Sequence, residues 1–284
     1  MIKAIFFLFA ISLVSCAKKE VAPAKSEHLE AELIAEVTSI EPGKPFWVAL
    51  KLEMEESWHV NWLNPGDAGL APTLKWALPQ GFTAGDINWP IPKRIPVGDM
   101  MLFGYDGTVL LPVEITPPSQ FNEDEFTFSA DCDWVVCGDV CIPGDAKLSL
   151  TLAVKKEAPQ INTEHAAEFA STRNNSPIAN GIFNLTASAS DNAIHIDLVP
   201  ISGEDNKIES IVFFPEVQGF ISNAAEQRFS QNGIGYQLEI DRDQMYANVL
   251  EKLKGIIVFK SKDYSAARGV FIDVPLSKQI SFQN

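Results

Sequence analysis

Two cysteines separated by three residues are the side chains of this sequence best suited to chemistry. They are Cys137 and Cys141, with Gly138 and Asp139 between them. Four residues of extended strand would hold their Cα atoms roughly 13 Å apart, whereas a disulfide needs about 4.4–6.8 Å. Because Gly and Asp favour turns, we expect the two cysteines to face each other across neighbouring antiparallel segments.

The small size of this loop favours a redox role for the pair. A disulfide that closes so short a loop stabilises a fold by only about 2 kcal/mol in the chain-entropy model. Stabilising disulfides are needed mainly below about 70–80 residues, and this chain has 284. Thiol–disulfide exchange is therefore the favoured interpretation, with a structural disulfide and a metal site as alternatives.

On both sides of the pair, apolar and polar residues alternate as they do in half-buried β-strands. The upstream apolar face carries Phe126, Phe128, Ala130, Cys132, Trp134 and Val136. The downstream apolar face carries Leu148, Leu150, Leu152 and Val154. Period two places Cys132 and Cys137 on opposite faces of the strand. The β-branched residues around the pair argue against a helical turn there.

The composition indicates a globular protein with enough apolar residues for two cores. The chain is 46% hydrophobic, with 6 Trp and 18 Phe. Its formal net charge is −15, and Lys and Arg are not clustered, which argues against a nucleic-acid partner. The histidines are His28, His59, His165 and His195. They show no ligand spacing, so we expect no metal site and no cofactor besides a redox-active disulfide.

The N-terminus has the pattern of a targeting segment. An apolar run over residues 4–14 is short for a membrane span. It ends in the letters LVSC at Cys16, which resemble the lipobox of bacterial lipoproteins. This resemblance implies a signal peptide over residues 1–16, lipidation of Cys16, and, because Ala17 follows, an anchor in the outer membrane. The alternatives are an ordinary signal peptide and an uncleaved anchor.

Export to the periplasm would place the remaining cysteines where disulfides persist. With Cys16 acylated, three cysteines remain and one thiol is unpaired. Because Cys132 and Cys137 lie on opposite faces of the strand, we expect Cys132 to be the unpaired thiol. It would be buried beside Phe128 and Trp134 as a small hydrophobe.

One long segment of the first half lacks a strand pattern. Residues 89–107 carry three prolines before Val97 and glycines at 98, 104 and 107. We expect a long irregular loop whose tip holds Met100, Met101, Leu102, Phe103 and Tyr105. Loops of this length in compact domains are usually functional.

The strand pattern predicts an all-β chain of two immunoglobulin-like β-sandwich domains in tandem. After a flexible tether over residues 17–27, the first domain spans residues 28–156. A polar linker with a short helix is expected over 157–180. The second domain spans 181–284, with a helical insert expected over 241–253.

Several short motifs surround the cysteines. They are Trp58-His59, Asn64-Pro65-Gly66-Asp67, Trp76 with Leu78-Pro79-Gln80-Gly81, Trp89-Pro90, Phe103-Gly104-Tyr105, and the stretch from Val136 to Pro143. Together they resemble the periplasmic N-terminal domain of DsbD-type thiol:disulfide interchange proteins, and most closely the ScsB-like branch. The resemblance covers about residues 28–156. The resemblance implies that the second half corresponds to the second β-sandwich of that branch.

This resemblance implies that Cys137 and Cys141 cycle between dithiol and disulfide. In the family, a thioredoxin-like part and a membrane part supply electrons to this domain, which passes them to oxidised periplasmic proteins. By the same analogy, Cys141 forms the intermolecular bond and Cys137 resolves it. The sequence contains neither membrane helices nor a thioredoxin-like Cys-x-x-Cys, so we expect the donor to be a separate protein.

The loop over residues 89–107 is expected to regulate access to the pair. Leu102, Phe103 and Tyr105 would lie over the sulfurs as a cap and move aside for a partner. Alternatively, Phe103 and Tyr105 fill the core. Asp139, Asp99 and Tyr105 are the candidates for shifting the thiol pKa.

Two further hypotheses come from other functional classes. In the first, the protein handles Cu(I), with soft ligands from Cys137, Cys141, Met100, Met101 and His59. In the second, the protein is a non-catalytic binding module, and its disulfide is structural, with a potential below about −300 mV.

Overall fold

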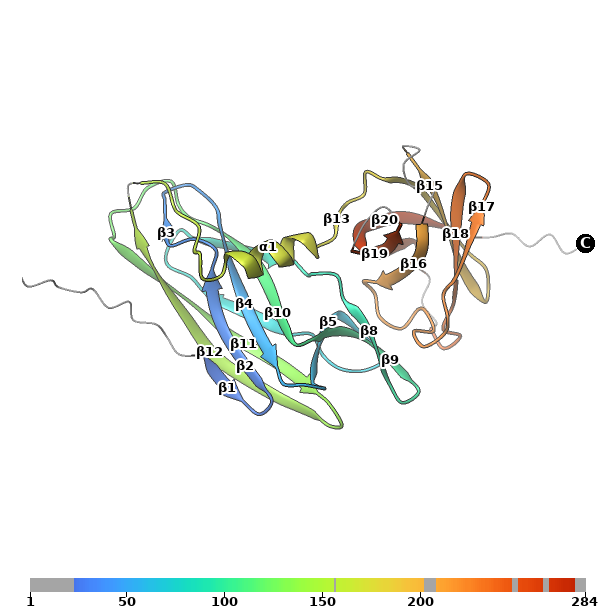
Figure 1. Cartoon of the computed structure of the whole chain (residues 1–284), viewed down its shortest axis with the longest axis horizontal. Helices are drawn as coiled ribbons and strands as arrows, with labels where there is room; N and C mark the ends of the chain where they lie inside the picture. The colour runs from blue at the N-terminus through green and yellow to red at the C-terminus, as the bar shows by residue number, and fades with distance from the viewer. Residues whose placement is uncertain (1–22, 156, 202–207, 247–249, 263–265, 279–284) are drawn as a thin grey trace, which may run out of the picture.

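Two β-sandwiches lie side by side along the long axis of the molecule (Figure 1). The computed structural model describes residues 23–155, 157–201, 208–246, 250–262 and 266–278. The predicted fold class, an all-β chain with two immunoglobulin-like sandwiches, is confirmed. Within the described ranges, no helix has the length and apolar character needed to cross a membrane.

One layer of the first sandwich is a five-stranded sheet. Its strands, in spatial order, are β1 (Ala24–Ser26), β2 (Leu29–Ala35), β4 (Phe46–Met54), β10 (Thr108–Thr116) and β7 (Thr83–Ile87). Leu50 of β4 lies opposite Leu111 of β10, and both are fully buried. Alternate residues of these strands face the core, as the period of an extended strand requires.

The other layer has seven strands and carries the cysteine hairpin. Its strands, in spatial order, are β3 (Ser39–Ile40), β12 (Cys141–Val154), β11 (Glu125–Cys137), β5 (His59–Gly66), β9 (Met100–Asp106) and β8 (Lys93–Val97), with β6 (Thr73–Ala77) also paired to β11. β11 and β12 pair along their whole length and place both cysteines at the tip of the hairpin. Phe128 of β11 and Leu50 of β4 belong to the core between the two layers.

The start of the described chain corrects the predicted tether. Residues 17–27 were expected to be flexible, but Ala24–Ser26 form β1 and pair with β2. Lys25 lies opposite Glu30 and forms an ion pair with it. An open sheet edge offers unpaired backbone groups to such a segment. The predicted signal peptide, Cys16 and the tether up to residue 22 lie outside the described residues.

The predicted irregular loop over 89–107 is wrong, because this segment contains a β-hairpin. Lys93–Val97 and Met100–Asp106 pair as β8 and β9. Gly98 has φ +58° at the turn between them, a conformation that glycine adopts without strain. Pro96 is tolerated since β8 is the edge strand of its sheet. The large apolar residues therefore lie along β9 and not at a loop tip.

A helix, α1 (Ala166–Asn174), lies in the segment predicted to be a linker with a short helix. Phe169 is buried against the side of β2, β4 and β10 that faces away from the sandwich core. Arg173 forms an ion pair with Glu36 at the end of β2. The helix is thus attached to the first sandwich, and Figure 1 shows it on the path to the second.

The second sandwich is built from one eight-stranded sheet that folds back on itself. Its strands, in spatial order, are β16 (Ile208–Pro215), β19 (Lys252–Ser261), β20 (Arg268–Lys278), β14 (Phe183–Ala189), β15 (Ala193–Pro200), β18 (Gly235–Asp241) and β17 (Arg228–Asn232), with β13 (Ile178–Ala179) also paired to β20. The N-terminal part of β20 pairs with β19, and its C-terminal end pairs with β14. One strand therefore connects the two layers of this sandwich.

The predicted helical insert over 241–253 is absent from the described residues of that range. Asp241 ends β18, and Lys252 begins β19. Between them, the Asp243 carboxylate accepts a hydrogen bond of 2.8 Å from the Met245 N–H. An aspartate that bonds the backbone two residues on favours a turn over a helix.

The two sandwiches share an apolar interface. Phe214 of β16 and Ile256 of β19 belong to the hydrophobic core of the first sandwich. The Phe214 ring meets Trp62 and Phe103 edge to face, with centroids 6.1 and 5.1 Å away. Figure 1 shows β5, β8 and β9 at the end of the first sandwich that adjoins the second.

The Asn64-Pro65-Gly66-Asp67 motif supplies a polar part of this interface. The Asn64 side-chain amide donates to the Pro215 carbonyl at 2.8 Å. The Gln218 side-chain amide donates to the Gly66 carbonyl at 3.0 Å. A motif noted in the sequence only for the family resemblance therefore lies at the end of β5 and binds the second sandwich.

Candidate functional site

A disulfide closes the tip of the β11–β12 hairpin. Cys137 and Cys141 are joined, with their Cα atoms 4.1 Å apart. The three residues between them form a turn in which the Gly138 N–H donates to the Val140 carbonyl at 2.9 Å. The two cysteines thus face each other across antiparallel strands, as the turn residues predicted.

The two cysteines differ in their exposure to solvent. Cys137 is 2% exposed, whereas Cys141 is an exposed residue at the start of β12. Val140 beside it is 61% exposed, and Asp139 is also exposed in the turn. A protein approaching the tip therefore meets Cys141 before it meets Cys137.

Cys137 lies in a row of four side chains that crosses the sheet. Cys141, Cys137, His59 and Asp106 are successive register partners on β12, β11, β5 and β9. Val136 faces the core, so the row projects from the opposite face of the sheet. Residues directly opposite each other on antiparallel strands have Cβ atoms about 4.5–5.5 Å apart. The row thus places a disulfide sulfur, an imidazole and a carboxylate on neighbouring strands.

His59 is buried at the centre of this row. The residue is 5% exposed, and its Nε2 has no hydrogen-bond partner among the described residues. Burial lowers the pKa of the His59 imidazole, and the nearby Asp106 carboxylate opposes this effect only in part. Asp106 in turn forms an ion pair with Lys93 of β8. His59 therefore favours the neutral form, which can accept a proton.

One aromatic ring lies against the turn, and a second ring stacks on it. A Cβ atom on Gly138 would be 3.1 Å from the Trp58 indole, so the absence of a side chain lets the indole pack there. The His28 ring stacks on Trp58, with centroids 3.9 Å apart and planes 10° apart. His28 Nδ1 is 2.6 Å from a Glu55 carboxylate oxygen. The Trp58 indole thus covers one side of the turn at Gly138.

The residues predicted to form a cap are core residues of β9. Leu102, Phe103 and Tyr105 are all buried, and β9 is paired on both sides, with β5 and β8. The Tyr105 hydroxyl donates to the Pro90 carbonyl at 2.7 Å, and burial raises the pKa of its phenol. A strand held on both edges does not swing away as a loop does, so the cap prediction is wrong and the core-filling alternative is right.

The far end of β9 does not reach the cysteines. Asp99, Met100 and Met101 precede Asp106 by five to seven residues, which corresponds to roughly 17–23 Å along a strand. Asp99 is therefore too distant to tune the thiols, and the two methionines are too distant to join His59 in a copper site. No group of three or more His, Cys, Asp or Glu suited to a metal ion occurs within the described ranges.

Cys132 is the buried free thiol that the strand alternation predicted. Burial, together with the charges of Asp131 and Asp133, raises the pKa of its thiol to about 12. The thiolate is the reactive species of cysteine, so a raised pKa suppresses reactivity at every pH below about 12.

We expect Cys132 to resist alkylation in the folded protein. At pH 8, a thiol with a pKa of about 12 is ionised in roughly one molecule in ten thousand. Peptide mapping by mass spectrometry of a reduced Cys16→Ser variant treated with iodoacetamide should find Cys132 unlabelled when the protein is folded and labelled after unfolding in urea. A label on Cys132 in the folded protein would contradict its burial.

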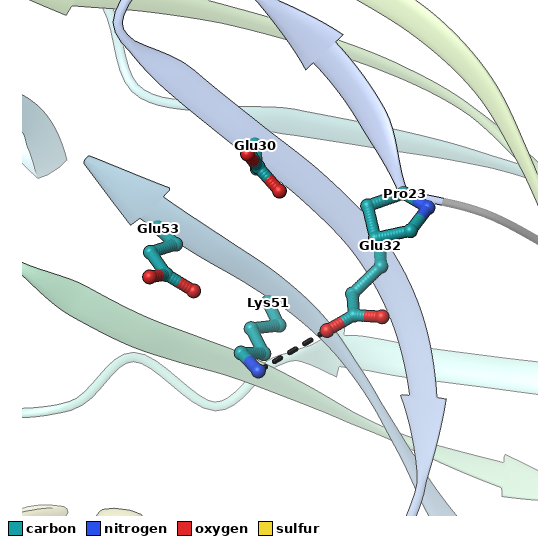
Figure 2. Close-up of a pocket in the computed structure, with 5 residues that line it drawn as sticks. All are labelled: Pro23, Glu30, Glu32, Lys51 and Glu53. Carbon is teal, nitrogen blue, oxygen red and sulfur yellow. Dashed lines mark ion pairs between the residues drawn. The ribbon is translucent and has the colours of Figure 1, made fainter. Parts of the chain in front are cut away.

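A small pocket lies elsewhere, on the side of β2 and β4 that faces away from the core. Its lining residues are Pro23, Glu30, Glu32, Lys51 and Glu53, and Figure 2 shows Lys51 pointing toward Glu32. The Lys51 ammonium is also 3.1 Å from Glu168 of α1. Burial opposes its charge, but the hydrogen bonds to Glu168 and Glu32 prevail and raise the pKa of Lys51. This charge cluster fastens α1 to the sheet, and we assign it no catalytic role.

The family of the first sandwich follows from comparison with known proteins. Residues 26–153 match the family described as thiol:disulfide interchange protein DsbD, N-terminal. This part of the chain is a DsbD-type N-terminal domain. The matched residues include the cysteine hairpin. The family and the cysteine pair together indicate thiol:disulfide exchange as the general chemistry. The search of curated proteins found no match.

Solved structures extend the comparison to the whole fold. The chain is similar to the N-terminal periplasmic domain of ScsB from Proteus mirabilis, with 17% identity, a TM-score of 0.63, and coverage of 88% of this chain and 94% of that one. At this identity the likeness shows the fold alone. A protein of unknown function from Porphyromonas gingivalis W83 has 13% identity, a TM-score of 0.23, and coverage of 88% and 100%. A conserved domain protein from Bacillus anthracis has 9% identity, a TM-score of 0.27, and coverage of 89% and 88%. These last two scores are too low to support an argument.

The structure also assigns positions to residues that the sequence did not single out for exchange. In the sequence, His59 belonged to one of the family motifs and suggested a copper ligand, and Asp106 suggested no role. In the DsbD-type domain both lie in the row that contains Cys137. One feature of the sequence could have drawn attention to His59, which directly follows Trp58 at the start of a strand. The pairing register of that strand with β11, which places His59 beside Cys137, could not be read from the sequence.

Proposed function

We propose that the Cys137 and Cys141 pair relays electrons by thiol–disulfide exchange between a thioredoxin-like donor and oxidised periplasmic proteins. The DsbD-type domain and the disulfide at the hairpin tip support this chemistry. The disulfide itself is the redox group, and exchange between thiols and disulfides requires no further cofactor.

The unequal exposure of the two sulfur-bearing residues is the observation that carries this proposal. Exchange requires one cysteine that a partner can reach and a second that resolves the mixed disulfide. Cys141 is exposed, and Cys137 is 2% exposed. This asymmetry fits Cys141 as the attacking cysteine and Cys137 as the resolving one.

The exchange proceeds in two steps when the pair is reduced. The Cys141 thiolate attacks one sulfur of the acceptor disulfide, which breaks that bond, forms a mixed disulfide and releases one acceptor thiolate. The Cys137 thiolate then attacks the sulfur of Cys141, and the second acceptor thiolate leaves. Two electrons pass to the acceptor, and the Cys137–Cys141 disulfide forms again. A donor dithiol restores the reduced pair by the reverse steps.

The tip of the hairpin supplies a contact surface for such partners. Val140 is 61% exposed directly beside Cys141, and an exposed apolar side chain suits a transient protein contact. We place the exchange in the periplasm, in line with the periplasmic ScsB domain of similar fold. In this proposal lipid on Cys16 holds the protein at the outer membrane, and the donor is a thioredoxin-like protein or a membrane protein of the DsbD type.

The redox potential of the pair tests this function. We expect glutathione buffers at pH 7 to reduce the disulfide reversibly, with a midpoint potential above about −300 mV, because structural disulfides lie below that value. Alkylation followed by mass spectrometry measures the oxidised fraction at each buffer ratio. The Cys132→Ala variant is the matched control and should have the same midpoint. A disulfide that glutathione leaves intact would identify a structural role instead.

A further inference from the structure

One buried titratable side chain beside the disulfide has no role in the exchange steps above. His59 is 5% exposed, and its Nε2 is fully buried without a hydrogen-bond partner among the described residues. A buried polar atom without a partner destabilises a fold. A different state of the protein can supply the missing partner.

The disulfide occupies the one neighbouring sulfur that could serve as such a partner. Cys137 is the register partner of His59, and both project from the side of the sheet that faces away from the core. In the oxidised state the Cys137 sulfur is bonded to Cys141 and carries no proton. Reduction of the disulfide creates a thiol at this position, and a thiol can donate to an imidazole nitrogen.

On the side of His59 away from Cys137, the Asp106 carboxylate stabilises a positive charge on the imidazole ring. Asp106 is the register partner of His59 on β9, and Lys93 pairs with Asp106 on the far side. The charged and titratable groups around His59 in the sheet are thus Cys137 on β11, Asp106 on β9 and, behind it, Lys93 on β8. A nucleophile, a base and a carboxylate in sequence are the arrangement by which proteins activate weak nucleophiles.

We propose that His59 is the proton acceptor for Cys137 in the reduced domain, and that Asp106 positions and stabilises the protonated ring. This inference rests on the exchange function proposed above. When the pair is reduced, the Cys137 proton moves to the His59 imidazole, and a thiolate and an imidazolium face each other. The thiolate then attacks the Cys141 sulfur of the mixed disulfide and displaces the partner thiolate, which takes up the proton. In the reverse direction, the imidazolium returns its proton to the Cys137 thiolate as that sulfur leaves.

Titration of His59 in the unmodified protein tests this proposal without a substitution. NMR of the labelled full chain follows each histidine against pH, first with the pair oxidised and then with it reduced. We expect the His59 pKa to rise on reduction by about one unit or more, because an adjacent opposite charge favours the protonated ring. Burial lowers the His59 pKa in the oxidised protein, so the ring should be neutral near pH 7 in that state. The NMR signals of His195, on β15 of the second sandwich, should be the same in the two redox states and serve as the internal control.

The rate of mixed-disulfide resolution gives a second readout. Reduced protein reacts with oxidised glutathione at Cys141, and stopped-flow detection follows the release of glutathione as Cys137 resolves the adduct. With His59 present, we expect the rate to change little between about pH 6 and 8. In the His59→Gln variant the rate should fall about tenfold at pH 7 and rise about tenfold per pH unit, as for an unassisted thiol. His28→Gln alters a ring near the tip but outside the row, and it should keep the profile of the unmodified protein.

The outcomes separate this inference from the function on which it rests. If His59 titrates identically in both redox states while glutathione still cycles the pair, the inference is wrong and the exchange function stands. If the rate profile of His59→Gln matches that of the unmodified protein, the inference is also wrong. A disulfide that glutathione does not reduce would overturn both.

Discussion

Replacing Cys141 with serine is expected to abolish covalent capture of partner proteins, whereas replacing Cys137 with serine should increase it. In the Cys141→Ser variant the only cysteine left at the tip is Cys137, which is 2% exposed and out of reach of a partner disulfide. In the Cys137→Ser variant the exposed Cys141 still attacks, but no resolving thiol breaks the mixed disulfide. Non-reducing gels after incubation with an oxidised thioredoxin-like protein measure both outcomes.

Cys132→Ala provides the matched control for this prediction. It removes a buried thiol whose pKa is raised to about 12 and leaves the tip unchanged, so exchange should proceed at the normal rate. Capture by Cys141→Ser at a rate similar to Cys137→Ser would show that the exposure difference does not select the attacking cysteine. Loss of exchange only in Cys132→Ala would show that the pair has been assigned incorrectly.

Replacing Phe214 with alanine is expected to destabilise the first sandwich, although Phe214 belongs to the second. Its ring is 4% exposed and belongs to the core that the two sandwiches share. Removal of a buried Phe side chain costs about 3–5 kcal/mol. All 6 Trp of the chain lie in its first half, so tryptophan fluorescence during urea unfolding reports on the first sandwich. With typical urea dependence, the midpoint should fall by more than about 1 M.

Phe271→Ala is the control for this prediction. Phe271 lies on β20 of the second sandwich and is 45% exposed. Its removal should change the free energy of unfolding by about 0.5 kcal/mol or less. If Phe214→Ala leaves the tryptophan-detected midpoint unchanged, the two sandwiches unfold independently and the shared core contributes no stability to the first.

The cysteine hairpin could be predicted because its determinants lie close together in the sequence. Alternation over Phe126 to Val136 specifies the strand and its core face, and Gly138 with Asp139 specifies the turn. The same alternation separates the buried Cys132 from Cys137. Local periodicity and turn chemistry are properties that a sequence displays directly.

The β8–β9 hairpin could not be predicted by the same means. Three prolines and three glycines over 89–107 suggested a loop, because each of these residues disfavours regular strands. Pairing of β9 with β5 on one side and β8 on the other overrode that local preference. The aromatic residues of β9 then filled a core shared with Phe214, and a movable cap was excluded.

By itself, the sequence determined the all-β class, the facing cysteines and the family of the first sandwich, since strand period, turn residues and short motifs are local. Only the tertiary structure decided which cysteine is exposed, which residues lie beside Cys137 and how the two sandwiches meet. His59, Asp106 and Cys137 lie far apart along the chain, and strand pairing alone brings them into one row. The register of strands distant in sequence depends on long-range packing, which residue spacing does not encode.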